Sequence, residues 1–404
     1  MNDSRQHPAS KSPDPATTDQ ESQDSRAAEH ATGWQRRAGD FSGAFADLGT
    51  FLPLIVGMLA VQQLDPAGTL VGFGLFALAT AVIYRRPVPV QPMKAVAAIV
   101  IGGGLGVSGV AATGVLLGSI LCLLAAFGAV GQLGRHIPQT VLGGIQTGVG
   151  FYLVWAGIRL GMQQPLVGIA ALLGGILLQR TRLRPLAALA VIAGAALWGV
   201  TRADAVLPTL SLSLSLPQLV LPDWDSLRAS AQYVLLPQLA LTLTNATLIT
   251  AAIAADLFPH DRTRITPDRL ACSSGVLNLL LAPFGAFPMC HGAGGLVVQH
   301  KYGARTGLAP AIFGGSCLLL GLLLAPQAMA LLALLPVAAV GALLIPAGMD
   351  LVASKRLQRT SPDRLLVVLG TGLSCVLLNF ALGLVVGLLL EAIRTLLVQR
   401  DRSS

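Results

Sequence analysis

The chain has few charged and few aromatic residues. Asp, Glu, Lys and Arg make up 11% of its 404 residues and aromatic side chains 5%, while 53% are hydrophobic and the mean hydropathy is +0.70. An average globular domain is about one quarter charged, so a water-soluble fold is excluded. Apolar stretches of roughly 20 residues, the length that crosses a bilayer, recur from Phe41 onward. Because these stretches are continuous rather than alternating, they exclude a β-barrel and predict an all-α polytopic membrane protein.

The sequence also lacks paired cysteines and enzyme motifs. Its five cysteines are scattered through apolar segments without disulfide or metal-ligand spacing, and we interpret them as small packing residues. No phosphate-binding loop, Ser/His/Asp arrangement or cluster of metal ligands is visible. We therefore expect no enzyme, no cofactor and no metal ion. Transport driven by ATP would require another subunit.

The basic residues and the polar N-terminal segment indicate a topology. Residues 1–38 are rich in Ser, Pro, Asp and Gln, which predicts a disordered cytoplasmic tail and not a signal peptide. The net charge of +8 is concentrated in short loops between apolar stretches. This pattern fits the excess of Lys and Arg on the cytoplasmic side of membranes and argues against a nucleic-acid partner. It places both termini in the cytoplasm. Compact loops and the composition suggest a bacterial chain, and hence the inner (plasma) membrane.

Division at Pro, Gly and charge clusters gives seven predicted spans on each side of a polar stretch, fourteen in all. The expected domains are a first repeat over 39–200, an extracytoplasmic linker over 201–230, a second repeat over 231–399 and a cytoplasmic tail over 400–404. With seven spans per half, the second half enters from the opposite side, as in transporters built from inverted repeats. Pro92-Met93 in the third span and Pro288-Met289 in the tenth match at an offset of 196 residues, which supports this arrangement.

Both matching segments are broken by proline at membrane depth. Residues that precede a proline avoid the helical region, so 88–91 is expected to be extended and Pro92 to begin a helix. Irregular backbone persists in a bilayer only where it lines a cavity or is buried in protein. Two half-helices should therefore point N-termini at one site, with free N–H groups at Met93, Lys94, Ala95, Cys290, His291 and Gly292. With the Lys94 ammonium, two helix N-termini give about +2, which suits a dianion.

Polar residues in the first and eighth spans extend this site. Asp47 is an intramembrane carboxylate that is expected either to balance Lys94 or to bind the proton that drives transport, with helix capping as the structural alternative. Gln238, Thr242 and Asn245 recur at spacings of four and three, so they share one helical face. From that face they can donate hydrogen bonds to an oxyanion or to a neighbouring helix.

His291 beside Cys290 is expected to bind the anion or to titrate during transport, with a structural role as the alternative. A metal site is not favoured there, because no second pair of ligands has suitable spacing. We interpret Gln146 and Asn379 as packing residues or interhelical hydrogen-bond donors. For Glu391 the sequence indicates no partner.

Four segments carry a resemblance to a known family. They are SGAFADLGTFLPL (42–54), PVPVQPMKAVAA (88–99), PQLALTLTNATLITAAIAADLFP (237–259) and PMCHGAGGLVVQHKYGARTG (288–307). Together they resemble the molybdate transporter family, a branch of the sulfate permease superfamily. The resemblance implies a core domain, a gate domain and an anion site between the third and tenth spans. The family's motif residues fall on Asp47, Gln91, Pro92, Lys94, Gln238, Asn245, His291, Gly292 and Gly294.

We predict a secondary active transporter that imports a tetrahedral oxyanion, molybdate in first place, by alternating access with proton coupling. Sulfate is the close alternative, since both ions are dianions, and an anion channel or exchanger on the same fold is another. A nucleobase permease is disfavoured because such permeases typically have a carboxylate in the eighth span, which here offers Gln238 and Asn245 before Asp256 at its inner end. The expected partners are the oxyanion and the lipid bilayer, with homodimerisation left open. The predicted substrate-binding residues are Gln91, Pro92, Met93, Lys94, Gln238, Thr242, Asn245, Cys290, His291, Gly292 and Gly294, with Asp47 as the coupling candidate.

Overall fold

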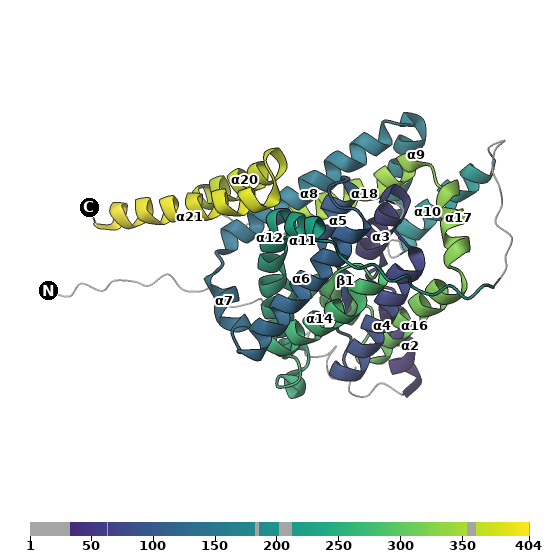
Figure 1. Ribbon diagram of the computed structural model, residues 1–404, viewed down its shortest axis with the longest axis horizontal. Coiled ribbons are helices and arrows are strands. Elements are labelled where there is room, and N and C mark those ends of the chain that lie inside the picture. Colours follow the sequence, from purple (N-terminus) through teal and green to yellow (C-terminus); the bar gives the residue numbers. More distant parts are fainter. Residues whose placement is uncertain (1–32, 63, 182–185, 202–211, 354–360, 404) are drawn as a thin grey trace.

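The computed structural model describes residues 33–62, 64–181, 186–201, 212–353 and 361–403, and almost all of its regular structure is helical (Figure 1). The helices confirm the predicted all-α class, and one short two-stranded sheet joins the two halves of the chain. The first half contains α2 (Gly33–Ala44), α3 (Leu48–Gln62), α4 (Pro66–Tyr84), β1 (Val90–Pro92), α5 (Lys94–Ile101), α6 (Val107–Ala126), α7 (Val130–His136), α8 (Gln139–Gly161), α9 (Pro165–Gln179) and α10 (Ala187–Val200).

The second half repeats this order of elements around a second strand. It contains α11 (Trp224–Ser230), the π-helical η2 (Ala231–Leu235), α12 (Leu236–Leu241), the π-helical η3 (Thr242–Ile249), α13 (Thr250–Leu257), η4 (Pro259–Asp261), α14 (Pro267–Leu281), η5 (Ala282–Phe284), β2 (Met289–His291), α15 (Ala293–Lys301), α16 (Leu308–Leu323), α17 (Ala325–Leu334), α18 (Val337–Val352), α20 (Pro362–Leu377) and α21 (Phe380–Ser403).

Six described helices are long and apolar enough to cross a membrane, or seven if the pair α16 and α17, bent by 87°, is one span. Three shorter apolar helices, α9, α10 and α18, fall below that length. The structure thus shows a polytopic membrane protein, while the count of fourteen spans stays a prediction.

Two predicted boundaries differ from the structure. Helix α2 begins at Gly33, so residues 33–38, which the sequence assigned to a disordered tail, are helical. The eighth span runs from Trp224 to Leu257 and therefore begins inside the predicted linker. Both boundaries were drawn where polar residues begin, but helices extend past the apolar stretch into polar sequence. Most of the predicted tail, residues 1–32, lies outside the described residues.

Glycine contacts join helices of opposite halves. Helices α4 and α16 approach so closely that a Cβ at Gly314 would lie 2.8 Å from the carbonyl oxygen of Gly74. Helices α6 and α14 meet in the same way, and a Cβ at Gly118 would lie 2.8 Å from the oxygen of Gly275. Gly118 and Gly314 are separated by the same 196 residues that relate the two Pro-Met segments. Gly118 of α6 and Gly314 of α16 thus occupy equivalent positions of an inverted repeat, while their partners Gly74 and Gly275 differ by 201 residues.

The helices form two groups. The core group consists of α2–α6, α11–α16 and the two strands, and β1 and α5 lie near its middle (Figure 1). The gate group consists of α8–α10, α18, α20 and α21, in which α8 packs against both α18 and α20. In Figure 1 the hairpin of α20 and α21 projects beyond the rest of the molecule toward the C-terminus.

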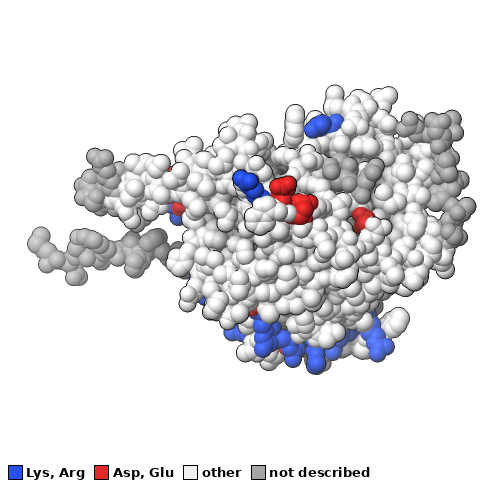
Figure 2. Space-filling view, viewed as in Figure 1, with Lys and Arg blue, Asp and Glu red and all other residues white. Residues whose placement is uncertain are grey.

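Charged side chains are unevenly distributed over the surface. Figure 2 shows Lys and Arg gathered along one edge of the molecule, while much of the visible face holds few charges. The loop after α4 is held by Arg86, whose Nε lies 2.6 Å from Asp261 Oδ2, and Arg264 pairs with the same carboxylate at 2.9 Å. A basic edge beside an apolar belt fits the predicted cytoplasmic side of a membrane protein.

A leucine at Gly314 should destabilise the protein far more than a leucine at the adjacent Gly315. The first side chain would press against the backbone of α4, and overpacking of this kind costs about 1–3 kcal/mol. Nothing lies within 4 Å of a Cβ at Gly315, so Gly315→Leu is the matched control. Thermal unfolding of both variants in detergent measures the difference. Equal melting temperatures would contradict the close contact between α4 and α16.

Candidate functional site

The two broken spans meet through an antiparallel strand pair. In the register of β1 with β2, Gln91 lies opposite Cys290, Val90 opposite His291 and Pro92 opposite Met289. Each strand is followed by a short helix, α5 or α15, so the predicted interruptions and half-helices are confirmed. Helix α5 begins at Lys94 rather than at Pro92, because Pro92 is the last residue of β1.

The backbone N–H groups at the start of α5 are largely paired within the protein. The N–H of Met93 donates to Pro288 O at 3.0 Å, and the N–H of Ala95 donates to Gln238 Oε1 at 3.0 Å. The prediction that these two groups are free is therefore wrong. Unpaired backbone groups at membrane depth are costly, and the eighth span supplies the side chain that pairs with the second of them.

Asn278 of α14 pairs with β2, a role that the sequence analysis missed. Its Nδ2 donates to Met289 O at 2.6 Å, and its Oδ1 accepts from Met289 N–H at 2.8 Å. One buried amide thus satisfies both backbone groups of a strand residue. The sequence feature that could have indicated this role is a lone asparagine within the apolar run VLNLLL.

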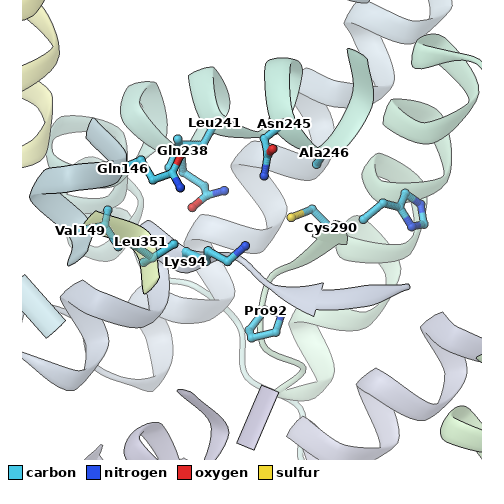
Figure 3. Close-up of a pocket in the computed structure, with 11 residues that line it drawn as sticks. Pro92, Lys94, Gln146, Val149, Gln238, Leu241, Asn245, Ala246, Cys290 and Leu351 are labelled. Atoms are coloured by element: carbon cyan, nitrogen blue, oxygen red, sulfur yellow. The ribbon is translucent and has the colours of Figure 1, made fainter. Parts of the chain in front are cut away.

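The half-helices border a small cavity of about 40 Å³ between the core group and the gate group (Figure 3). A bound water needs about 10–15 Å³ of such space, so the cavity holds about three water-sized groups. Its lining residues are Pro92, Lys94, Gln146, Val149, Gln238, Leu241, Asn245, Ala246, Cys290, His291 and Leu351.

This lining confirms part of the predicted set and adds to it. Six predicted residues line the cavity: Pro92, Lys94, Gln238, Asn245, Cys290 and His291. The other predicted residues, Asp47, Gln91, Met93, Thr242, Gly292 and Gly294, do not line it. Sequence reasoning missed the gate residues Gln146, Val149 and Leu351 and the core residues Leu241 and Ala246. For Gln146 the signal was available, because it is an amide in an apolar span.

Lys94, Asn245 and Gln146 provide the polar groups that the cavity offers to a ligand. Figure 3 shows the Lys94 ammonium and the Asn245 amide directed into the space, with the Cys290 sulfur facing them. In the described parts of the chain, no carboxylate lies within 4.0 Å of the Lys94 nitrogen. The side-chain amides of Asn245 and Gln146 likewise have no hydrogen bond to another described residue. The cavity therefore combines one cation with two neutral amides.

Gln238 and Thr242 are engaged within the protein. Gln238 Oε1 accepts from α5, and its Nε2 donates to Thr242 Oγ1 at 3.0 Å. Both residues lie where the eighth span changes between α-helical and π-helical turns, an irregularity frequent at functional sites. The predicted shared face is confirmed by the Gln238–Thr242 bond, which positions the Gln238 amide as a cap for α5.

The ring of His291 is held by protein groups. Its Nε2 lies 2.9 Å from Ser273 Oγ and its Nδ1 3.3 Å from Pro89 O. The ring also packs edge-to-face on Phe76 and Tyr84. Of the two alternatives in the sequence analysis, this geometry favours the structural role, because both ring nitrogens already have partners.

Asp47 and Lys94 are joined through Gln91. Gln91 Nε2 donates to Asp47 Oδ2, and Gln91 Oε1 accepts from Lys94 Nζ at 3.3 Å. A Cβ at Gly292 would collide with the Gln91 amide, and one at Gly295 would lie 2.7 Å from Asp47 Oδ2. Open space surrounds Gly294. The negative charge of Asp47 therefore offsets the positive charge of Lys94 without direct contact. The Gln91 amide lies between the two groups and fits there because positions 292 and 295 are glycines.

Among the described residues, no three His, Cys, Asp or Glu side chains gather into a potential metal site. The five cysteines are free thiols there. The chemistry of the cavity is thus that of hydrogen bonding and a single positive charge.

A family model described as "Molybdate transporter of MFS superfamily" matches residues 39–153 and 230–351, more than half of the chain. The chain belongs to the molybdate transporter family. Molybdate transporter 2 of Arabidopsis thaliana is 29% identical over 90% of this chain and 91% of its own length. Molybdate transporter 1 of the same plant is 27% identical over 89% of each chain. These relatives of the molybdate transporter family are transporters, which supports the expectation that the chain is not an enzyme.

Solved structures place this member of the molybdate transporter family in a known fold. The transmembrane domain of the cyanobacterial bicarbonate transporter BicA matches with a TM-score of 0.63 at 16% identity, over 86% of this chain and 96% of that domain. The murine anion transporter Slc26a9 in its inward-facing state matches with a TM-score of 0.65 at 13% identity, over 97% of this chain and 73% of that one. The chain therefore shares the fold of these two anion transporters.

Replacement of Asn278 by leucine should weaken the strand pair. The change leaves the N–H and C=O of Met289 unpaired, and a buried unpaired group costs about 1–3 kcal/mol. We expect a clear fall in the melting temperature of the detergent-solubilised protein. Asn379→Leu is the control, because Asn379 only accepts from the N–H of Leu382 at an exposed helix end. A fall no larger than that of the control would contradict the role of Asn278.

Proposed function

We propose that the chain imports a tetrahedral oxyanion, molybdate in first place, by secondary active transport. The observation that carries this proposal is the position of the Lys94 ammonium. Its ammonium projects into a small cavity at the N-terminus of α5, and no carboxylate of the described chain lies within 4.0 Å of its nitrogen. An intramembrane charge of this kind is costly unless it serves binding.

The charge of the site favours an anion. The Lys94 ammonium contributes +1 and each half-helix N-terminus about +0.5, so the groups around the cavity sum to about +2. The partly positive ends of α5 and α15 keep this sign even though Met93 and Ala95 already donate to protein oxygens. A Lys94 ammonium with neutral amides repels a cation and attracts a small dianion.

The size of the cavity favours a compact ion. A volume of about 40 Å³ holds roughly three water-sized groups, which suits an ion of few atoms. Molybdate ranks above sulfate because the chain belongs to the molybdate transporter family and its relatives are molybdate transporters.

The position of the cavity supports alternating access. Lys94, Asn245 and Cys290 approach it from the core group, whereas Gln146, Val149 and Leu351 approach it from the gate group. Movement of one group against the other would expose an anion at this interface to one side of the membrane at a time. The basic edge in Figure 2 would then face the cytoplasm, with both termini on that side of the inner membrane.

Uptake into proteoliposomes tests the substrate. We expect molybdate uptake that an inward proton gradient stimulates and that excess sulfate inhibits only weakly. Sulfate uptake in preference to molybdate would reassign the substrate within the same fold. Conduction without dependence on a gradient would indicate a channel, and uptake of neither ion would contradict the proposal.

Lys94→Ala should weaken molybdate binding by about 10- to 100-fold. A hydrogen bond to a charged partner contributes about 1.5–3 kcal/mol, and 1.4 kcal/mol is tenfold in affinity. Lys301→Ala is the matched control, since Lys301 is an exposed residue at the end of α15. Calorimetric titration of the purified, folded variants gives both dissociation constants. If Lys94→Ala binds molybdate as tightly as the wild type, Lys94 does not contribute to the binding site.

Gln146→Leu should weaken binding by about 10- to 100-fold. Gln146 is the polar residue that the gate group contributes to the cavity, and a hydrogen bond to a charged partner contributes about 1.5–3 kcal/mol. Gln163→Leu, at an exposed position after α8, is the control. If Gln146→Leu binds molybdate as tightly as this control, the gate group makes no polar contact with the anion.

A further inference from the structure

The segment that precedes α11 is an extended strip with leucines on one face. Residues 212–221, LSLSLPQLVL, belong to the predicted linker, and in Figure 1 they run as an extended trace toward α11. Successive side chains of an extended chain point to opposite faces, and Ser213 and Ser215 are partly buried while the leucines are not. Five leucines have between 61% and 77% of their surface exposed: Leu212, Leu214, Leu216, Leu219 and Leu221. Residues 212–221 are called the leucine strap.

Backbone hydrogen bonds hold the leucine strap against the ends of two core elements. Three of its N–H groups donate to carbonyl oxygens of α16 and η5: Ser213 to Leu323 O at 3.3 Å, Ser215 to Leu322 O at 2.8 Å and Val220 to Pro283 O at 2.7 Å. The last carbonyls of a helix have no partner within the helix, so the strap satisfies two of those at the end of α16. Its position relative to the core group is thereby fixed.

The exposed face of the leucine strap needs a cover. None of its ten residues is charged, whereas Asp223, Asp225 and Arg228 follow directly after it. Five exposed leucines side by side form an apolar surface, and an apolar extended edge in water promotes aggregation. A stable protein therefore needs either lipid or another protein chain over this face.

The leucines continue the lipid-facing surface of the helices beside them. On α16, Leu319 and Leu320 are exposed in the turn before the carbonyls that accept from the strap. Leu280 at the end of α14 and Phe284 in η5 are exposed near the other attachment point. Exposed apolar side chains on membrane spans contact acyl chains. The strap therefore extends an apolar surface that already faces the bilayer.

The length of α16 places the strap close to the hydrocarbon. Arg305 lies just before α16, and basic residues of this kind mark the head-group level. The helix has 16 residues, so it rises about 24 Å at 1.5 Å per residue. The hydrocarbon core of a bilayer is about 30 Å thick. The far end of α16, where the strap is attached, therefore lies a few ångströms short of the opposite boundary.

The open backbone edge of the strap excludes a deeper position. Within the described ranges, no residue accepts a hydrogen bond from the N–H of Leu214 or Leu216. Such groups are costly in hydrocarbon and need water or lipid head groups. The leucine side chains need acyl chains, and the head-group boundary offers both. Trp224, exposed at the end of the strap, is of the residue type enriched at that boundary.

We propose that the leucine strap is a membrane-binding element whose five leucines enter the boundary region of one lipid leaflet. The partner is the phospholipid surface itself, with acyl chains against the leucines and head groups along the open backbone edge. With the proposed orientation this is the outer leaflet, but contact with a leaflet does not depend on what the protein transports. The connection between the two repeats is then held at the membrane surface.

Fluorescence in liposomes of phosphatidylcholine and phosphatidylglycerol tests the contact. A polarity-sensitive dye is attached to Leu214→Cys in a chain with Cys122→Ser and Cys272→Ser, because the remaining native thiols are buried. We expect blue-shifted emission, loss of fluorescence with lipids that carry a spin label high on the acyl chain, and little quenching by iodide. The control is Asp225→Cys, exposed in the first turn of α11, which should show the reverse.

A charge on the apolar face should release the strap from the lipid. Leu216→Asp would put a carboxylate among acyl chains, so a dye at position 214 should shift to the red and become accessible to iodide. Gln218→Asp is the control, because Gln218 is an exposed and already polar residue of the strap, and it should change the emission less. If Leu214→Cys does not fold, Leu219→Cys carries the dye in the same experiments.

Two results would overturn the proposal. Equal quenching by iodide at positions 214 and 225 would place the strap in water. Protection from both iodide and spin-labelled lipid, lost as the protein is diluted in the membrane, would identify a second copy of the chain as the cover. Neither measurement uses a transported anion, so failure of the proposed function would leave these outcomes unaffected.

Discussion

The pairing of β1 with β2 is the constraint on which the rest of the site depends. A chain that leaves helical geometry inside a bilayer must find partners for its backbone groups. The two strands pair with each other, Met93 pairs with Pro288, and the side chains of Gln238 and Asn278 take up further N–H and C=O groups. Two half-helices can begin at membrane depth only because these bonds exist.

The same bonds decide which polar residues remain for a ligand. Gln238 lies at the cavity, yet its amide is occupied by α5 and Thr242, and the His291 ring is occupied by Ser273 and Pro89. What remains is the Lys94 ammonium and the amides of Asn245 and Gln146. In the proposed function, recognition of the anion would therefore depend on few contacts, with the charge of Lys94 the largest of them.

Much of this architecture could be predicted from the sequence. Low charge and long apolar stretches indicate a membrane protein, and Pro92 and Pro288 at an offset of 196 residues mark the two breaks. Residue patterns do not show which polar groups satisfy one another. Asn278 and Gln238 act through partners more than ten residues away, and Gln146 enters the site only because α8 packs beside the core group. Such roles follow from tertiary packing.

The charge balance of the core group has a consequence for transport. Without a ligand, ionised Asp47 and Lys94 sum to zero, so a return step of the empty site moves no side-chain charge. A bound dianion alone brings the sum to −2, and a proton on Asp47 reduces this to −1. Each elementary charge that crosses a membrane costs about 2.3 kcal/mol per 100 mV. Because an inside-negative potential opposes anion import, a proton on Asp47 would halve that electrical cost.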